Sequence, residues 1–132
     1  MSTIKKGWHI YLPALVWTLI ILKLSTGPGV QIPFTWENII GIDKLGHLFF
    51  YLVHTILLYW TFEEEALFKT RQQRIWWSFL LSMILGILLE IVQFSFYPNR
   101  YFEILDIIAN IIGSYLGTRL FTIVNRLNMA EK

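Results

Sequence analysis

Long apolar runs leave this chain few folds other than a bundle of membrane-spanning helices. Four such runs lie at residues 8–22, 45–62, 75–96 and 104–124. About 20 apolar residues in a helix cross the hydrocarbon core of a bilayer, and the last two runs have this length. Only 15% of the residues are charged, and a chain of 132 residues is too short to bury so much apolar surface in a soluble core.

The apolar runs and the residues between them predict where each helix begins and ends. These helices cover about residues 8–24, 43–62, 75–96 and 103–124, in a single all-α membrane domain over residues 1–132. The first run resembles a signal peptide, but no small-x-small cleavage site follows Leu24, so we interpret it as an uncleaved helix. Glycine and proline make 25–42 a loop, which we expect on the membrane surface. Charges of both signs make 63–74 a solvated loop.

Lysine and arginine are distributed unevenly over the ends of these helices. One side would carry Lys5, Lys6, Lys69, Arg71, Arg74, Arg119, Arg126 and Lys132, and the other only Lys23, Lys44 and Arg100. The positive-inside rule then places both termini in the cytoplasm of a multi-pass protein of the cytoplasmic membrane. Arg119 is expected to be an anchor whose head reaches the membrane surface.

Composition excludes several classes of function. The net charge is only +2, which gives no argument for a nucleic-acid partner. The chain has no cysteine, so disulfides, thiolate metal sites and cysteine nucleophiles are excluded. Composition leaves the oligomeric state open.

Polar residues recur on one face of three expected helices, at the spacings that a helix places on one side. The faces consist of Asp43, His47, Phe50, Tyr51 and His54 in the second helix, Ser82, Gly86, Glu90 and Gln93 in the third, and Asp106, Asn110, Gly113 and Gly117 in the fourth. A charge at the centre of a span costs about 2.5–3.5 kcal/mol on insertion scales, so these faces should meet inside the bundle.

Depth estimates bring part of these faces to one level. With a rise of about 1.5 Å per residue, Glu90 and Asn110 lie about 9 Å from the outer ends of their helices, and His47 lies about 6 Å down. Lys44 and Arg100 would lie above them. The inner half shows no comparable cluster, so the sequence predicts a polar pocket that opens outward or to the outer leaflet.

Simpler roles explain part of the pattern. Asp43 could be an N-cap, and Glu103 could complement the dipole of the fourth helix. Gly113 and Gly117 could be packing glycines, and His54 a hydrogen-bonded residue of the bundle interior.

Glu90 has none of these explanations. It caps no helix, and it lies too deep for its carboxylate to reach water easily. It must therefore be paired, protonated or in a wet cavity, with Arg100, Lys44 and His47 as candidate partners. Two interpretations stay open, a buried structural ion pair and a functional pocket.

Known enzyme motifs give little support for catalysis. HExxH, GxSxG and a glycine-rich phosphate loop are absent from the sequence. His47, Glu90 and Asp106 could form a hard-metal or hydrolytic site, but they lie on different helices and spacing alone cannot support one. We therefore predict no metal and no cofactor.

Several polar motifs, taken together, resemble those of the VanZ-like family of membrane proteins. They are Asp-Lys-Leu-Gly-His from Asp43, Glu-Ile-Val-Gln from Glu90, Pro-Asn-Arg ending at Arg100, and Asp-x-x-x-Asn-x-x-Gly from Asp106, and the resemblance covers about residues 9–120. The recurrent polar residues of the family correspond to Asp43, Lys44, His47, Glu90, Gln93, Arg100, Asp106 and Asn110. The residues after Arg100 depart from the family, where a small polar residue or glycine would follow.

The resemblance implies a small bacterial integral membrane protein. From the polar pocket itself, we predict that these recurrent polar residues bind a ligand. The founding member of the family is linked to low-level resistance to lipid-tailed glycopeptides such as teicoplanin. The expected partner is therefore an envelope lipid or a lipid-tailed glycopeptide. Lys44 and Arg100 would meet an anionic head group, and Glu90 and Asp106 would hold these cations.

Phe49, Phe50 and Phe94 could line a route for the tail of such a ligand. Two alternatives stay open. One is a membrane enzyme that modifies a lipid or a cell-wall precursor, with Glu90 or His47 as base. In the other, the polar residues only hold the bundle together.

Overall fold

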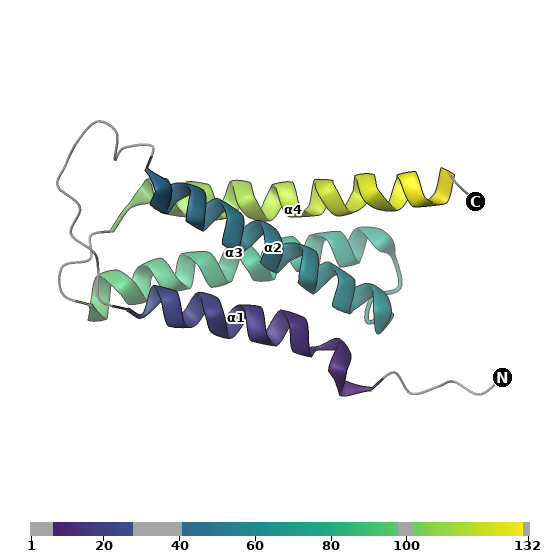
Figure 1. Cartoon of the computed structure of the whole chain (residues 1–132), viewed down its shortest axis with the longest axis horizontal. Coiled ribbons are helices and arrows are strands. Elements are labelled where there is room, and N and C mark those ends of the chain that lie inside the picture. Colours follow the sequence, from purple (N-terminus) through teal and green to yellow (C-terminus); the bar gives the residue numbers. More distant parts are fainter. Residues whose placement is uncertain (1–6, 28–40, 98–101, 131–132) are drawn as a thin grey trace.

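A computed structural model describes residues 7–27, 41–97 and 102–130, with side chains as far as residue 124. Every regular element in these ranges is helical. The elements are the 3-10 turn η1 (Trp8–Ile10), α1 (Leu12–Ser25), α2 (Ile42–Glu64), α3 (Arg71–Phe96) and α4 (Ile104–Ala130). The four α-helices lie lengthwise in one elongated bundle (Figure 1). The expected all-α fold is confirmed.

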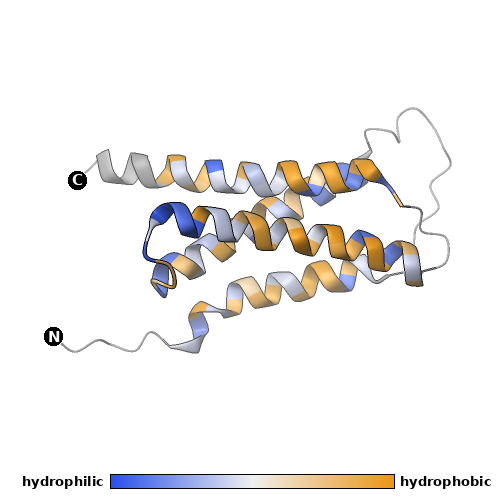
Figure 2. Ribbon diagram, turned by 180° about the vertical axis from the view of Figure 1, so that it is seen from behind, coloured by the Kyte–Doolittle hydropathy of each residue, from blue (hydrophilic) through white to orange (hydrophobic). Residues whose placement is uncertain are grey.

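Three of these helices are long and apolar enough to cross a membrane. They are Ile42–Glu64, Arg71–Phe96 and Ile104–Val124. Hydrophobic residues cover much of these helices, whereas hydrophilic residues gather at the turn between α2 and α3 (Figure 2). The side chains that the bundle leaves exposed are therefore suited to contact lipid.

The N-terminal run is divided, in contrast to the continuous helix expected over 8–24. α1 begins at Leu12 and has 14 residues, and Pro13 lies in its first turn. Proline is favoured there because it has no N–H for an earlier helical hydrogen bond. The preceding residues form η1 instead of further α-helical turns. At about 1.5 Å per residue, α1 measures about 21 Å, less than the roughly 30 Å of a hydrocarbon core.

The turn between α2 and α3 is shorter than the charged loop expected over 63–74. α2 continues to Glu64, and α3 already begins at Arg71. Thr70 caps α3, because its hydroxyl accepts from the Gln73 N–H at 3.1 Å while its own N–H donates to the Gln73 side chain at 3.2 Å. This reciprocal capping box ends the turn early. α4 likewise extends to Ala130, beyond the expected end at 124.

Two glycines let the backbones of α2 and α4 touch. A Cβ atom at Gly117 would lie 2.6 Å from the Leu52 carbonyl oxygen. A Cβ at Gly113 would lie even closer to the Leu48 carbonyl oxygen, well inside the 3.0 Å that real Cβ atoms keep. The interpretation of both residues as packing glycines is confirmed. Their contact fixes the rotation and register of α2 against α4.

A chain of hydrogen bonds crosses the middle of the bundle. His54 on α2 lies 3.0 Å from the hydroxyl oxygens of both Thr18 on α1 and Ser82 on α3. Ser114 on α4 donates to Ser82 at 3.1 Å. The expectation that His54 is a hydrogen-bonded interior residue is confirmed. Hydroxyl residues on α1, α3 and α4 thus meet His54 of α2 in a second group of buried polar side chains, which contains no charged residue.

Replacing Ser82 with alanine should lower the free energy of unfolding by about 1–2 kcal/mol. The substitution removes a partner from the buried His54 ring, and a buried polar atom without a partner costs about this much. Thermal unfolding of the purified protein in detergent would measure the loss. Ser95, which is exposed on the same helix, provides the control substitution. Equal effects of the two alanines would contradict the role of the network.

Candidate functional site

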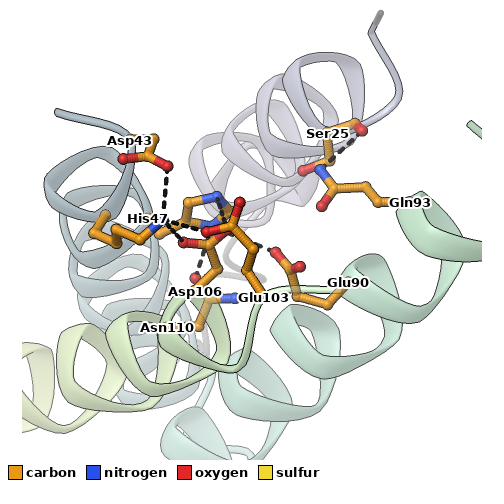
Figure 3. Close-up of polar contacts among 9 residues, drawn as sticks. Ser25, Asp43, His47, Glu90, Gln93, Glu103, Asp106 and Asn110 are labelled. Carbon is orange, nitrogen blue, oxygen red and sulfur yellow. Dashed lines mark hydrogen bonds and ion pairs between the residues drawn. The ribbon is translucent and has the colours of Figure 1, made fainter. Parts of the chain in front are cut away.

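Polar side chains from three helices converge where α2 and α4 begin and α3 ends (Figure 3). We call this group the polar cluster, which consists of Asp43, Lys44, His47, Glu90, Glu103, Asp106 and Asn110. Glu90 and Asn110 are 2% and 1% exposed. The four residues that the depth estimates and helix faces led us to expect together, His47, Glu90, Asp106 and Asn110, do lie together.

Lys44 is surrounded by carboxylates. Its Nζ lies 2.8 Å from Asp43 Oδ2, 2.5 Å from Glu103 Oε2 and 3.1 Å from Asp106 Oδ1. The Lys44 side chain is 13% exposed, whereas those of Asp43 and Glu103 are 44% and 45% exposed. The ammonium is therefore neutralised from within the protein, and two carboxylates remain accessible at the mouth of the cluster.

The structure corrects the simpler role of Asp43 and adds an ion pair to that of Glu103. Gly41, with extended backbone angles, is the N-cap of α2, so Asp43 is not the cap but lies in the first turn. Glu103 just precedes α4, where an acid suits the helix dipole, but it also pairs with Lys44 from α2. The sequence alone could have indicated this pairing, because Glu103 lies one turn before Asp106 and the two carboxylates therefore share a face at the start of α4.

Both ring nitrogens of His47 face oxygen atoms. Nδ1 lies 3.0 Å from Asn110 Oδ1 and 3.8 Å from Glu90 Oε1, and Nε2 lies 3.8 Å from Asp106 Oδ2. An amide oxygen can only accept, so the bond to Asn110 requires a proton on Nδ1. The ring is thus oriented by α4 and lies between carboxylates from α3 and α4. Such a ring can pass or hold a proton, or bind a polar ligand.

Asn110 retains unused hydrogen-bonding capacity. Its Nδ2 is buried and forms no hydrogen bond within the described part of the chain. Buried donors are rarely left without a partner in folded proteins. Its side chain lies against Gly86, where a Cβ would be 3.0 Å from Nδ2. This donor is available to a polar group that enters the cluster.

Gln93, one of the expected site residues, does not join the polar cluster. Gln93 is buried one turn beyond Glu90, but its Nε2 donates to the Ser25 carbonyl at the end of α1, at 2.9 Å (Figure 3). It therefore ties α3 to α1. Arg100, with most of the turn that carries it, lies outside the described residues.

One subset of the cluster has the geometry to hold a metal ion. His47, Glu90 and Asp106 each offer one ligand atom, and these atoms lie within 4.8 Å of one another. An imidazole with two carboxylates suits a borderline or hard divalent cation. Asp43, Glu103 and Asp106 form a second such group, but Lys44 already places a cation among them.

Comparison with known proteins identifies the family. The chain matches the VanZ/LLP1 family over residues 8–125, which includes the whole polar cluster. It is also 29% identical over 107 residues to a protein of Schizosaccharomyces pombe named "Uncharacterized protein C11E3.10". That match covers 80% of this chain, which spans 58% of the length of the yeast protein. No solved structure matches the chain. Since the family match covers most of its residues, this protein belongs to the VanZ/LLP1 family.

Proposed function

We propose that this protein binds the head group of an envelope amphiphile in its polar cluster, at the outer face of the cytoplasmic membrane. The observation that carries the proposal is the convergence of buried polar groups from α2, α3 and α4 at one end of the bundle, beneath two half-exposed carboxylates. Polar groups at this depth are expensive in a membrane and usually serve a function.

The proposed topology has four helices across the membrane and both termini in the cytoplasm. The end of the bundle at the turn between α2 and α3 carries Lys69, Arg71 and Arg74, and Arg119 lies towards the same end on α4. The positive-inside rule makes this end cytoplasmic and the polar cluster external. α1 runs beside the other helices (Figure 1), and tilt or local thinning of the bilayer allows a short helix to cross.

The described geometry favours a head group that carries an amine. Lys44 was expected to meet an anionic group, but three carboxylates already surround it. Asp43 and Glu103 instead offer half-exposed carboxylates to a cation at the mouth. A phosphoethanolamine lipid supplies such an amine, and so does an amine-bearing, lipid-tailed glycopeptide.

Apolar side chains next to the cluster suit the tail of such a ligand. Phe49 on α2 and Phe94 on α3 are exposed, as the expected route for a tail requires. Phe50 is only partly buried, but it packs against Trp17, with ring centroids 5.6 Å apart. Phe49 also contacts Trp17, with ring centroids 6.1 Å apart, but it remains exposed, so the tail would lie along Phe49 and Phe94, outside the bundle.

Neutralising the mouth should reduce binding of phosphatidylethanolamine at least ten-fold. The first variant combines Asp43→Asn with Glu103→Gln. A second variant, Glu90→Gln, tests the buried carboxylate of the polar cluster. Native mass spectrometry of the purified protein in mild detergent would measure retained lipid. Glu64→Gln, which removes an acid at the opposite end, is the control.

The same variants can be tested in cells. If the ligand is a lipid-tailed glycopeptide, Glu90→Gln or Arg100→Ala should abolish tolerance to teicoplanin-type antibiotics at unchanged expression. Unchanged lipid retention together with unchanged tolerance would refute the binding function.

A membrane enzyme is the second candidate, and the position of His47 is the observation that favours it. A ring held by Asn110, with carboxylates 3.8 Å from both nitrogens, has the arrangement of a general base or a metal ligand. Purified protein would then convert a labelled lipid or cell-wall precursor, and Glu90→Gln would stop the conversion. Elemental analysis of the same sample tests the metal-dependent form.

A further inference from the structure

We infer that a second lipid site lies at the opposite end of the bundle, in a groove between α3 and α4 that takes the phosphate head and upper acyl chain of an anionic phospholipid. The groove has a volume of about 460 Å³. Its lining includes Arg71, Trp76, Phe79, Tyr115, Thr118 and Arg119. None of these residues belongs to the polar cluster, so the two proposed sites can be tested independently of each other.

The cations of the groove are available to a phosphate. Arg71 and Arg119 are both exposed, and the lining contains no acidic residue among the described ones. The Arg71 guanidinium donates to the Thr122 carbonyl at 3.5 Å, the limit of a hydrogen bond. The Arg119 guanidinium lies 6.0 Å from the centre of the Tyr115 ring. Each guanidinium has five N–H donors in a fork that fits phosphate oxygens, so most of this capacity remains.

Polarity changes along the groove in the direction that an amphiphile requires. On α3 the lining runs from Arg71, beside the charged turn, through Trp76 to Phe79, a distance of about 12 Å. On α4 it runs inward from Arg119 to Tyr115. Both helices therefore present cations near the membrane surface and aromatic rings deeper, where tryptophan and tyrosine favour the interface.

Charge selects the occupant. A zwitterionic lipid has an amine that two arginines would repel, whereas phosphatidylglycerol or a related lipid has a net negative charge. Basic pockets between transmembrane helices on the cytoplasmic side are known to suit such head groups. Trp76 and Tyr115 are 54% and 52% exposed and would contact the upper part of the chain. A second protein copy would have to bring its own carboxylate into the membrane interface.

The test compares lipid binding by the full chain in mild detergent. Native mass spectrometry would follow titrations with dioleoyl phosphatidylglycerol and, separately, dioleoyl phosphatidylcholine. Arg71→Gln with Arg119→Gln should lower the affinity for phosphatidylglycerol at least ten-fold and leave phosphatidylcholine unchanged. Arg119→Lys keeps the positive charge but loses the forked N–H donors of the guanidinium, so it should lower the affinity for phosphatidylglycerol by less than the double variant does. Lys69→Gln removes an exposed cation at the same end that does not line the groove, and should change binding less than two-fold.

Three results would overturn the inference. The first is binding by the double variant within two-fold of the unmodified protein. The second is an equal loss with Lys69→Gln, which would mean a general surface charge effect. The third is a protein dimer that the double variant abolishes while phosphatidylglycerol binding stays unchanged. Because both arginines are exposed, the variants should fold, and an unchanged unfolding temperature without lipid would confirm that.

Discussion

Replacing Gly113 with alanine should lower the stability of the bundle by at least about 3 kcal/mol, at or above the upper end for overpacked interiors. The new methyl group would meet the Leu48 carbonyl, which is backbone and cannot turn aside as a side chain can. α2 and α4 would have to separate, and the contact at Gly117 would open with them. Thermal or denaturant unfolding in detergent measures the loss.

Gly46 provides a matched control on α2. A Cβ atom there would meet nothing within 4 Å, so alanine adds no clash. Alanine is favoured over glycine in a helix by roughly 0.5–1 kcal/mol, so Gly46→Ala should leave stability unchanged or raise it. The same substitution of glycine by alanine should thus lower stability at position 113 and leave it unchanged or raise it at position 46. If Gly113→Ala were as stable as Gly46→Ala, the close approach of α2 and α4 would be wrong.

Replacing Lys44 with methionine should lower the free energy of unfolding by about 2–3 kcal/mol. Breaking a buried ion pair by removing one partner costs about 3–5 kcal/mol, and the half-exposed state of Asp43 and Glu103 reduces this figure. Because methionine keeps most of the volume of the lysine side chain, the loss of unfolding free energy measures the effect of removing the positive charge. Unfolding in detergent, compared with Lys44→Arg as the charge-keeping control, would measure it.

A double-mutant cycle separates the ion pair from other effects. Asp106→Asn removes the most buried of the three charges around Lys44 at nearly constant volume. The loss of stability in the double variant with Lys44→Met should be about 1–2 kcal/mol smaller than the sum of the two single losses. Strictly additive effects would show that Lys44 and Asp106 do not interact in the folded protein.

Helical periodicity and length made most of the fold predictable. The apolar runs located all four helices, and a constant rise per residue brought Glu90, Asn110 and His47 to one level. These inferences use only the geometry of a single helix, which the local sequence determines. The break before α1 does not show in the apolar run, which continues on both sides of Pro13, although this proline lies in the first turn of α1.

Contacts between helices were less predictable from the same sequence. The partner of Lys44 on α4 depends on how α2 is rotated, and that rotation follows from the contacts of Gly113 and Gly117. Gln93 shares a face with Glu90, yet it reaches α1, because a helix face is wide enough to meet two neighbours. The His54 network uses single hydroxyl residues, which carry little signal until four helices are packed together.

The close contact of α2 with α4 has a consequence for motion within the site. Lys44 and His47 lie on one member of this pair, and Asp106 and Asn110 on the other, so their mutual distances belong to one stiff unit. Glu90 alone comes from α3. A tilt of α3, such as a change in bilayer thickness produces, would change the 3.8 Å separation of Glu90 from His47 and the packing of Gly86 against Asn110, while the contacts between α2 and α4 stay as they are. The thickness of the surrounding membrane would thus set the position of one carboxylate, that of Glu90, relative to the other charged groups of the site.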